Sequence, residues 1–225
     1  ISPYLYKDAD GEFMGIDVEI ATEALHRMGY EPEFKLIVWE NKNKLLEDGE
    51  VDCIWGCFSM NGREDKYLWA GPYLYSRQMV AVRMDSEIQK LKDLTGKMIA
   101  VQETSKAEEY FLRSDFEGIP DVSLVYCFSN MDEVFAALRK NYVEAICGHE
   151  SALISFINTA PDEYRLLEES FLYSALGVAF DIQYDEEFVK ELVKTLGDMM
   201  NDGTIAAIVG KYGLDAEKSL GRGND

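Results

Sequence analysis

Histidine and basic residues are scarce in this chain, and each shortage disfavours a class of function. Only two histidines occur among 225 residues, His26 and His149, which gives poor support to a zinc site or a histidine-based catalytic triad. The 22 basic residues face 42 acidic ones, for a net charge of −20. Nucleic acid and anionic lipid both attract cationic surfaces. We therefore expect neither as a partner.

Long apolar segments are missing as well. No run reaches the roughly 18 apolar residues that predict a membrane span, and no signal-peptide pattern is present. The four cysteines, Cys53, Cys57, Cys127 and Cys147, lack metal-ligand spacing. Three of them lie in apolar, strand-like runs, where free cysteine packs as a small hydrophobic residue. We predict reduced, buried thiols, and neither a metal nor another cofactor.

Apolar residues make up 47% of the chain, and their arrangement predicts the fold class. Short apolar runs alternate with amphipathic helical patterns, which is typical of an α/β fold. Strands are predicted at residues 33–39, 51–55, 78–83, 97–102, 124–128, 143–147 and 176–180. Helices are predicted at residues 17–28, 42–47, 105–113, 130–141, 150–158, 186–201 and 204–212. Residues 218–225 are polar and predicted to fray.

The segment 49–73 carries the strongest indication of function. A short apolar run leads into a small, polar turn, and a lone arginine follows the turn. A buried strand that ends in backbone N–H groups, a hydroxyl and a guanidinium is suited to hold a carboxylate. The candidate residues of this turn are Cys57, Phe58, Ser59 and Arg63. The alternative for Arg63 is a solvated surface charge.

Six short motifs, in order along the chain, carry a resemblance to a known family. They are Ser2-Pro3-Tyr4 with Asp10-Gly11, Gly15-Ile16-Asp17, Gly49-Glu50-Val51-Asp52, Gly71-Pro72-Tyr73, Leu91 to Lys97 with Ile99 to Gln102, and Asp202-Gly203-Thr204 with Lys211-Tyr212-Gly213. With these motifs the chain resembles the extracellular solute-binding proteins of the polar-amino-acid type. That family has the type 2 periplasmic-binding-protein fold.

The resemblance implies a clamshell of two α/β lobes joined by two crossover strands. Lobe 1 would comprise residues 1–80 and 179–225, and lobe 2 residues 81–178. A ligand bound in the cleft of such a protein biases the lobes towards closure. Family members open with a strand before the first motif, whereas residue 1 already lies past that strand.

The resemblance also assigns a carboxylate-binding role to two residues of lobe 1. Ser59 falls where the family has a serine or threonine that hydrogen-bonds a ligand carboxylate. Arg63 falls on the family's carboxylate-binding arginine if one residue is deleted from the turn, a change that Gly62 could accommodate.

Aromatic residues of lobe 1 are implied to flank the ligand. Trp39 falls where the family often has such an aromatic; the alternative is a core tryptophan. Tyr4 lies beside the same part of the cleft. The usual stacking aromatic aligns with Ile1, and Phe58 or Trp55 could replace it.

In lobe 2, the resemblance points to a turn at a helix start and to a departure from the family pattern. The family has a Gly-Thr-Thr-like turn that binds the ligand carboxylate, and this chain has Thr104, Ser105 and Lys106 at that place. Lys106 could instead be a solvent-exposed charge without a role in binding. The family's ammonium-binding aspartate aligns with His149. Either Glu150 or His149 takes that role, or the ligand is not a standard α-amino acid. Glu150 could instead be a helix N-terminal charge.

These features predict a non-catalytic, extracytoplasmic domain that binds an amino acid or a related carboxylate. Its partner would be the permease of an ABC importer or a membrane-anchored signalling module, and the domain alone would be a monomer. A few relatives with this fold are cyclohexadienyl dehydratases, so an enzyme with His149 or Glu150 as acid is the alternative. A purely structural interaction domain fits the serine and arginine less well.

Overall fold

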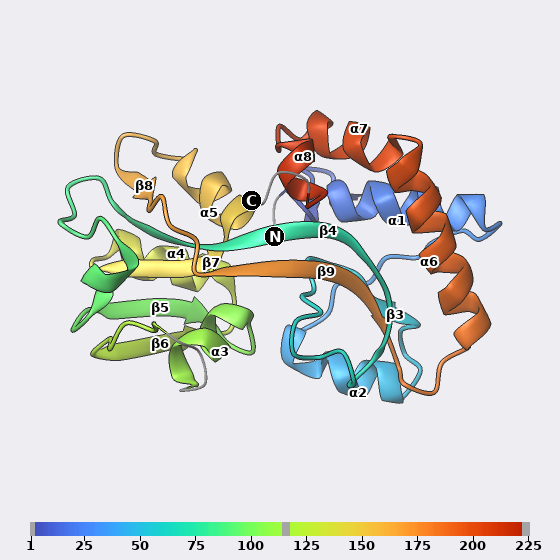
Figure 1. Ribbon diagram of the computed structural model, residues 1–225, viewed down its shortest axis with the longest axis horizontal. Coiled ribbons are helices and arrows are strands. Elements are labelled where there is room, and N and C mark those ends of the chain that lie inside the picture. The colour runs from blue at the N-terminus through green and yellow to red at the C-terminus, as the bar shows by residue number, and fades with distance from the viewer. Residues whose placement is uncertain (1–2, 114–117, 222–225) are drawn as a thin grey trace. The chain divides into compact units, whose positions relative to one another are not determined.

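The computed structural model describes residues 3–113 and 118–221, so Ile1 and the end of the predicted frayed tail lie outside the described residues. The chain forms two compact units, residues 1–76 with 174–225 (unit 1) and residues 77–173 (unit 2). It passes from one unit to the other within β4 (Leu68–Arg83) and again within β9 (Leu172–Phe180) (Figure 1). The predicted lobe limits, at residues 80 and 178, lie a few residues beyond these divisions.

Unit 1 is built around the unit-1 parts of β4 and β9, with β3 (Cys53–Ile54) beside β9. Strand β3 pairs with β9 in antiparallel register, with Ile54 opposite Ala179. The other elements of unit 1 are β1 (Tyr6–Lys7), β2 (Phe13–Met14), α1 (Ile16–Arg27), the 3-10 helix η1 (Trp39–Asn41), α2 (Lys42–Glu47), α6 (Glu186–Asn201), α7 (Thr204–Lys211) and α8 (Ala216–Ser219).

Alternating side chains of β9 pack on opposite faces of the strand, as the two-residue period of a strand requires. Val178 and Phe180 are fully buried in a core that α1, α6 and α7 complete. Ala179, between them, packs in a second core with Ile54 and Phe58. Helix α1 contributes Ile16, Ile20 and Ala24 to the first core. These residues are four positions apart and therefore lie on one face of the helix.

Unit 2 has a mixed sheet. Its elements besides β4 are η2 (Leu91–Leu94), β5 (Met98–Gln102), α3 (Lys106–Leu112), β6 (Leu124–Phe128), α4 (Met131–Arg139), β7 (Ala145–His149), α5 (Glu150–Ile157) and β8 (Tyr164–Leu166). Strands β6, β5 and β7 are parallel neighbours in that order, and β4 pairs antiparallel with both β7 and β8.

Helices pack on both faces of β5 and β7, which explains the unbroken apolar sequences of these two strands. Ala100 and Ile146 face a core that α4 and α5 complete. Their neighbours Ile99, Val101 and Cys147 face a second core with α3. All five are fully buried.

Two predictions made from the sequence are wrong. The segment 33–39 was predicted as a strand, but residues 33–38 are irregular and residue 39 begins η1. Leu36 and Val38 are 68% and 64% exposed. An apolar sequence pattern alone does not make a strand, because a strand also needs backbone hydrogen bonds to a neighbouring strand. Cys127, predicted to be buried, is exposed. It lies in β6, the last strand of the sheet order, which has a single neighbour, β5.

Candidate ligand-binding site

The turn that follows β3 is fixed to β9 by backbone hydrogen bonds. Met60 N donates to Ala175 O at 2.8 Å, and Gly177 N donates to Phe58 O at 3.0 Å. A Cβ atom at Gly177 would lie 2.7 Å from the Met60 side chain. The absence of a side chain at Gly177 therefore lets the turn lie directly against the strand.

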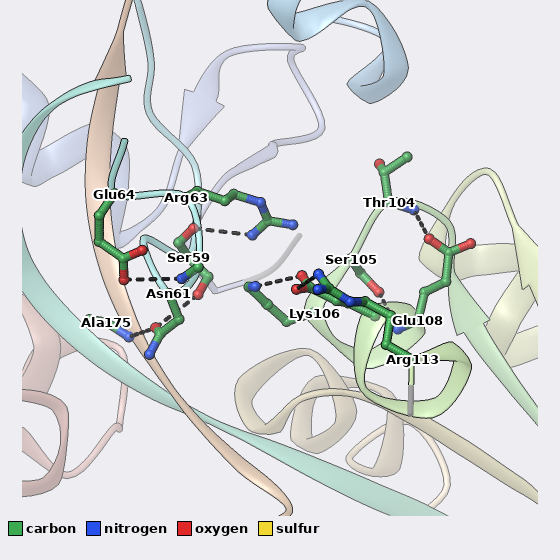
Figure 2. Close-up of polar contacts among 12 residues, drawn as sticks. Ser59, Asn61, Arg63, Glu64, Thr104, Ser105, Lys106, Glu108, Arg113 and Ala175 are labelled. Carbon is green, nitrogen blue, oxygen red and sulfur yellow. Dashed lines mark hydrogen bonds and ion pairs between the residues drawn. The ribbon is translucent and has the colours of Figure 1, made fainter. Parts of the chain in front are cut away.

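Ser59 and Arg63 are brought together in this turn. The amide oxygen of Asn61 accepts hydrogen bonds from Ser59 Oγ at 3.1 Å and from Ala175 N at 2.8 Å. Arg63 is half-buried and donates from Nη1 to Ser59 O at 3.1 Å (Figure 2). Its guanidinium carbon lies 5.3 Å from the centroid of the Phe58 ring. Arg63 is therefore held by its own turn, and Asn61 is a supporting residue that the sequence analysis missed.

A cluster of aromatic side chains packs against the turn. Phe58 is 1% exposed, and its ring lies 4.9 Å from that of Trp39 in an edge-to-face contact. The rings of Tyr67 and Trp69 lie 5.4 Å and 5.2 Å from Phe58. Trp69 Nε1 also donates to Arg63 O at 3.0 Å. These contacts fix the backbone at Arg63 and make Phe58 part of the core.

A second cation, Lys42, lies in the same region. It is 7% exposed, and its Nζ lies 4.8 Å from the Trp39 ring centroid. Burial, together with the charge of Arg63, lowers the pKa of Lys42 below its usual value. The sequence analysis missed Lys42, because a lysine in a short helix is usually a surface residue.

A buried carboxylate anchors the other side of the turn. Asp17 is 1% exposed and accepts hydrogen bonds from Cys57 N at 2.8 Å and from Tyr73 Oη at 2.7 Å. Burial raises the pKa of Asp17 to about 7, against the lowering effect of these two bonds. Cys57 has a φ of 54°, an unusual angle for a residue other than glycine. Tyr4, 2% exposed, packs in the same core.

In unit 2, three chain segments meet at one edge of the sheet. Strands β5 and β7 are parallel, so the residues after Gln102 and those at His149 leave the sheet at the same edge. Gln78 in β4 is opposite His149 in the antiparallel pairing. Open α/β sheets characteristically bind ligands at the carboxyl ends of their parallel strands.

The turn after β5 begins helix α3 with a serine cap. Ser105 Oγ accepts from Glu108 N at 3.2 Å and donates to Gln102 O at 2.5 Å. Thr104 is exposed with a φ of 54°, and its N–H donates to Glu108 Oε2 at 2.6 Å (Figure 2). The predicted capping role of Ser105 is confirmed.

Lys106 is not a solvated charge. Its side chain is 3% exposed, and Nζ lies 2.5 Å from Glu109 Oε2. Glu109 in turn accepts from Arg113 Nη1 at 2.9 Å. Lys106 is therefore buried and paired with Glu109, which it shares with Arg113.

His149 and Glu150 are each engaged by a neighbouring residue of β4. Gln78 Nε2 lies 3.0 Å from His149 Nδ1. Arg77 donates from Nε to Glu150 Oε2 at 2.9 Å and from Nη2 to Glu150 Oε1. Glu150 is also the first residue of α5, where a negative charge is favourable. The sequence analysis missed Arg77 and Gln78.

The predicted site residues thus fall into separate groups. Ser59, Arg63, Phe58 and Trp39 lie together in unit 1, whereas Cys57 and Tyr4 are buried in the other core of that unit. Thr104, Ser105, His149 and Glu150 lie at one sheet edge of unit 2. Lys106 is buried in α3. Their contacts with a ligand remain predictions. Within residues 3–113 and 118–221, no group of three or more His, Cys, Asp or Glu side chains is placed to hold a metal ion.

Comparison with protein families places nearly the whole chain in one group. The family described as bacterial extracellular solute-binding proteins, family 3, matches residues 1–215. Among curated proteins, the L-cystine-binding protein TcyA of Bacillus subtilis is 25% identical, over 96% of this chain and 79% of its own length.

Solved structures with the same fold include transport receptors. The substrate-binding protein of an ABC uptake transporter from Streptococcus pneumoniae, solved with bound histidine, has a TM-score of 0.86 and 21% identity, over 96% of this chain and 89% of that one. The ancestral amino-acid-binding protein AncCDT-1, a precursor of cyclohexadienyl dehydratase, has a TM-score of 0.83 and 22% identity, over 94% and 90% of the two chains. The predicted two-lobe clamshell fold class is therefore confirmed.

Proposed function

Because the chain belongs to the bacterial extracellular solute-binding proteins of family 3, we propose that it is a non-catalytic receptor for a small carboxylate-bearing solute, namely an amino acid or a close analogue. The observation that carries this proposal is the turn that presents the Arg63 guanidinium beside Ser59. L-cystine and histidine are the ligands named for two of its relatives. Both molecules carry an α-carboxylate.

The electrostatics of unit 1 favour an anion at this turn. Arg63 and Lys42 repel each other, since the charge of one lowers the pKa of the other. A carboxylate bound to Arg63 would offset this repulsion and accept two parallel hydrogen bonds from the guanidinium. The Ser59 hydroxyl, held by Asn61, would supply a further donor after a rotation.

At the unit 2 edge, the exposed Thr104 and the cap residue Ser105 are the groups that we propose to add hydroxyl contacts. His149 would contribute a ring nitrogen, which can donate or accept a hydrogen bond according to its tautomer. Lys106 would not contact the ligand directly, because its ammonium is buried and paired with Glu109.

We place this receptor outside the cytoplasmic membrane, as the family name indicates. Its partner would be the permease of an ABC importer or a membrane-anchored signalling module, and the isolated domain would be monomeric. Within the described residues, no helix combines the length and apolar character that crossing a bilayer requires.

A dehydratase activity fits the geometry less well, although one structural neighbour is the precursor of such an enzyme. Both oxygens of the Glu150 carboxylate already accept hydrogen bonds from Arg77. In this arrangement Glu150 is not placed to donate a proton to a substrate. His149 would then have to act alone as the acid.

Calorimetry with a panel of amino acids tests the proposed function. The protein is first unfolded, dialysed and refolded, so that any ligand carried through purification is removed. We expect at least one L-amino acid or close carboxylate analogue to bind with a Kd well below about 1 mM, which corresponds to about −4 kcal/mol. A cooperatively folded sample that binds no member of the panel below that concentration contradicts the proposal.

A further inference from the structure

Lys42 is a buried cation without a carboxylate partner of its own. The residue is 7% exposed, and its Nζ lies 4.8 Å from the centroid of the Trp39 ring. Nζ donates a hydrogen bond to Trp39 O that is long, at 3.4 Å. Within residues 3–113 and 118–221, no Asp or Glu side chain forms an ion pair with Lys42. A buried charge is costly to the folded protein unless an opposite charge compensates it.

A second buried lysine shows how this protein usually compensates such a charge. Lys106 is 5% exposed, and its Nζ lies 2.5 Å from Glu109 Oε2. Carboxylates are plentiful, since the chain has 42 acidic residues against 22 basic ones. Glu40 is the acidic residue whose charge acts on Lys42, but it is exposed and makes no ion pair with Lys42. The compensation that Lys106 obtains from its own helix is therefore missing at Lys42.

Lys42 and Arg63 lie over two aromatic rings that contact each other. The guanidinium carbon of Arg63 lies 5.3 Å from the Phe58 centroid, and the rings of Phe58 and Trp39 meet edge to face at 4.9 Å. Burial and the charge of Arg63 together lower the pKa of Lys42. All four residues belong to unit 1. The two cations thus form one cluster, in which a bound anion would be stabilised by both charges.

We propose that Lys42 is a specificity-determining residue that selects ligands with a second anionic group. One carboxylate of the ligand would bind Arg63, and the other would bind the Lys42 ammonium. The flexible lysine stem lets Nζ turn towards this carboxylate, and only the long hydrogen bond to Trp39 O is given up. The preferred substrate class is then short dicarboxylates, that is, acidic amino acids and their close analogues. This inference rests on the proposed function and names the substrate class of that same site.

Pairs of amino acids that differ in one carboxylate test this inference. L-glutamate is compared with L-glutamine, and L-aspartate with L-asparagine, by calorimetry; in each pair an amide of similar size replaces the second carboxylate. The proteins are the wild type, Lys42→Met, Lys42→Arg and the control Lys44→Met. Lys44 lies in the same helix, but its side chain is 76% exposed and pairs with Asp48. The quantity compared is the Kd of the amide divided by the Kd of the acid.

We expect this ratio to be about tenfold or more for at least one pair in the wild type, because the amide cannot make the charge-assisted bond to Lys42. The ratio should fall to about threefold or less in Lys42→Met and should stay above that in Lys42→Arg, which keeps the positive charge. Lys44→Met should keep the wild-type ratio within about twofold.

Three results of this comparison overturn the inference. The first is a wild type that binds the acids no better than the amides. The second is a ratio that Lys42→Met leaves unchanged. The third is an equal fall of the ratio in Lys44→Met, because the overall charge of the protein would then set the preference.

Thermal unfolding without ligand distinguishes this role from a purely structural one. Methionine keeps an apolar stem that can pack on Trp39 and removes a buried charge, so Lys42→Met should leave the Tm unchanged or raise it by a few degrees. A Tm that falls by several degrees means that Lys42 serves to stabilise unit 1, which also overturns the inference.

The calorimetry also separates this inference from the proposed function. If the refolded wild type binds amino acids of the panel without preferring the acidic member of either pair, the inference alone fails. If it binds no member of the panel or of the two pairs, the proposed function fails and the inference with it.

Discussion

Arg63→Gln is expected to weaken ligand binding by about 100-fold, or about 2.7 kcal/mol. A hydrogen bond to a charged group contributes about 1.5–3 kcal/mol, and a guanidinium can make two with one carboxylate. Glutamine keeps one N–H donor group but has neither the positive charge of arginine nor its two parallel N–H donors. The measurement is calorimetry with the tightest ligand of the panel, for the wild type and the variant side by side.

The control for this experiment is Arg83→Gln. Arg83 also ends in a guanidinium but pairs with Asp85 at 3.3 Å, and its side chain is 36% exposed. Its substitution should leave the Kd within about twofold, as is usual for an exposed ion pair. Equal losses of affinity in the two variants would mean that Arg63 acts through the overall charge of the protein, and no local anion contact would need to be invoked.

The second large effect is a pH dependence of stability that Asp17 confers. Burial raises the pKa of Asp17 from its usual value of 3.8 to about 7 in the folded protein. Between these values the folded state binds the proton more tightly than the unfolded state. The stability that this proton provides is fully present below about pH 4 and is lost as the pH rises through 7. Between pH 5 and pH 7, the loss is on the order of 2 kcal/mol.

Asp17→Asn isolates this effect from the titration of the many exposed acidic residues. The asparagine does not titrate, so the free energy of unfolding of the wild type minus that of Asp17→Asn should fall as the pH rises from 5 to 8. Urea unfolding at several pH values measures this difference. A difference that is constant with pH, or that grows, would show that Asp17 is ionised with an ordinary pKa. Tyr73→Phe removes one hydrogen bond that lowers the pKa, and should move the transition to higher pH.

Elements set by local pattern were predicted well from the sequence. The helices at residues 42–47 and 186–201 and the strand at 124–128 have the predicted bounds. The segment 33–38 carries an equally good strand pattern but is irregular. A helix makes its hydrogen bonds internally, whereas a strand depends on a neighbour that local sequence does not specify.

The residues of the candidate site also differ in whether local sequence or distant contacts place them. Ser59 and Arg63 were proposed from the sequence because their residue types follow a short apolar run. Asn61 was missed because its contact with Ala175 spans 114 positions, and Arg77 because its partner Glu150 is 73 positions away. Asp17 looked like an ordinary acidic residue in the first turn of a helix, where exposure would be usual. Its burial depends on Tyr73 and Cys57, which only the fold brings to it.

A crystal structure with the tightest-binding amino acid of the panel tests most directly that the turn after β3 holds an anion. The account predicts the ligand carboxylate within about 3.2 Å of the Arg63 guanidinium, with the Ser59 hydroxyl as a second donor. A bound ligand whose carboxylate contacts neither residue would contradict it.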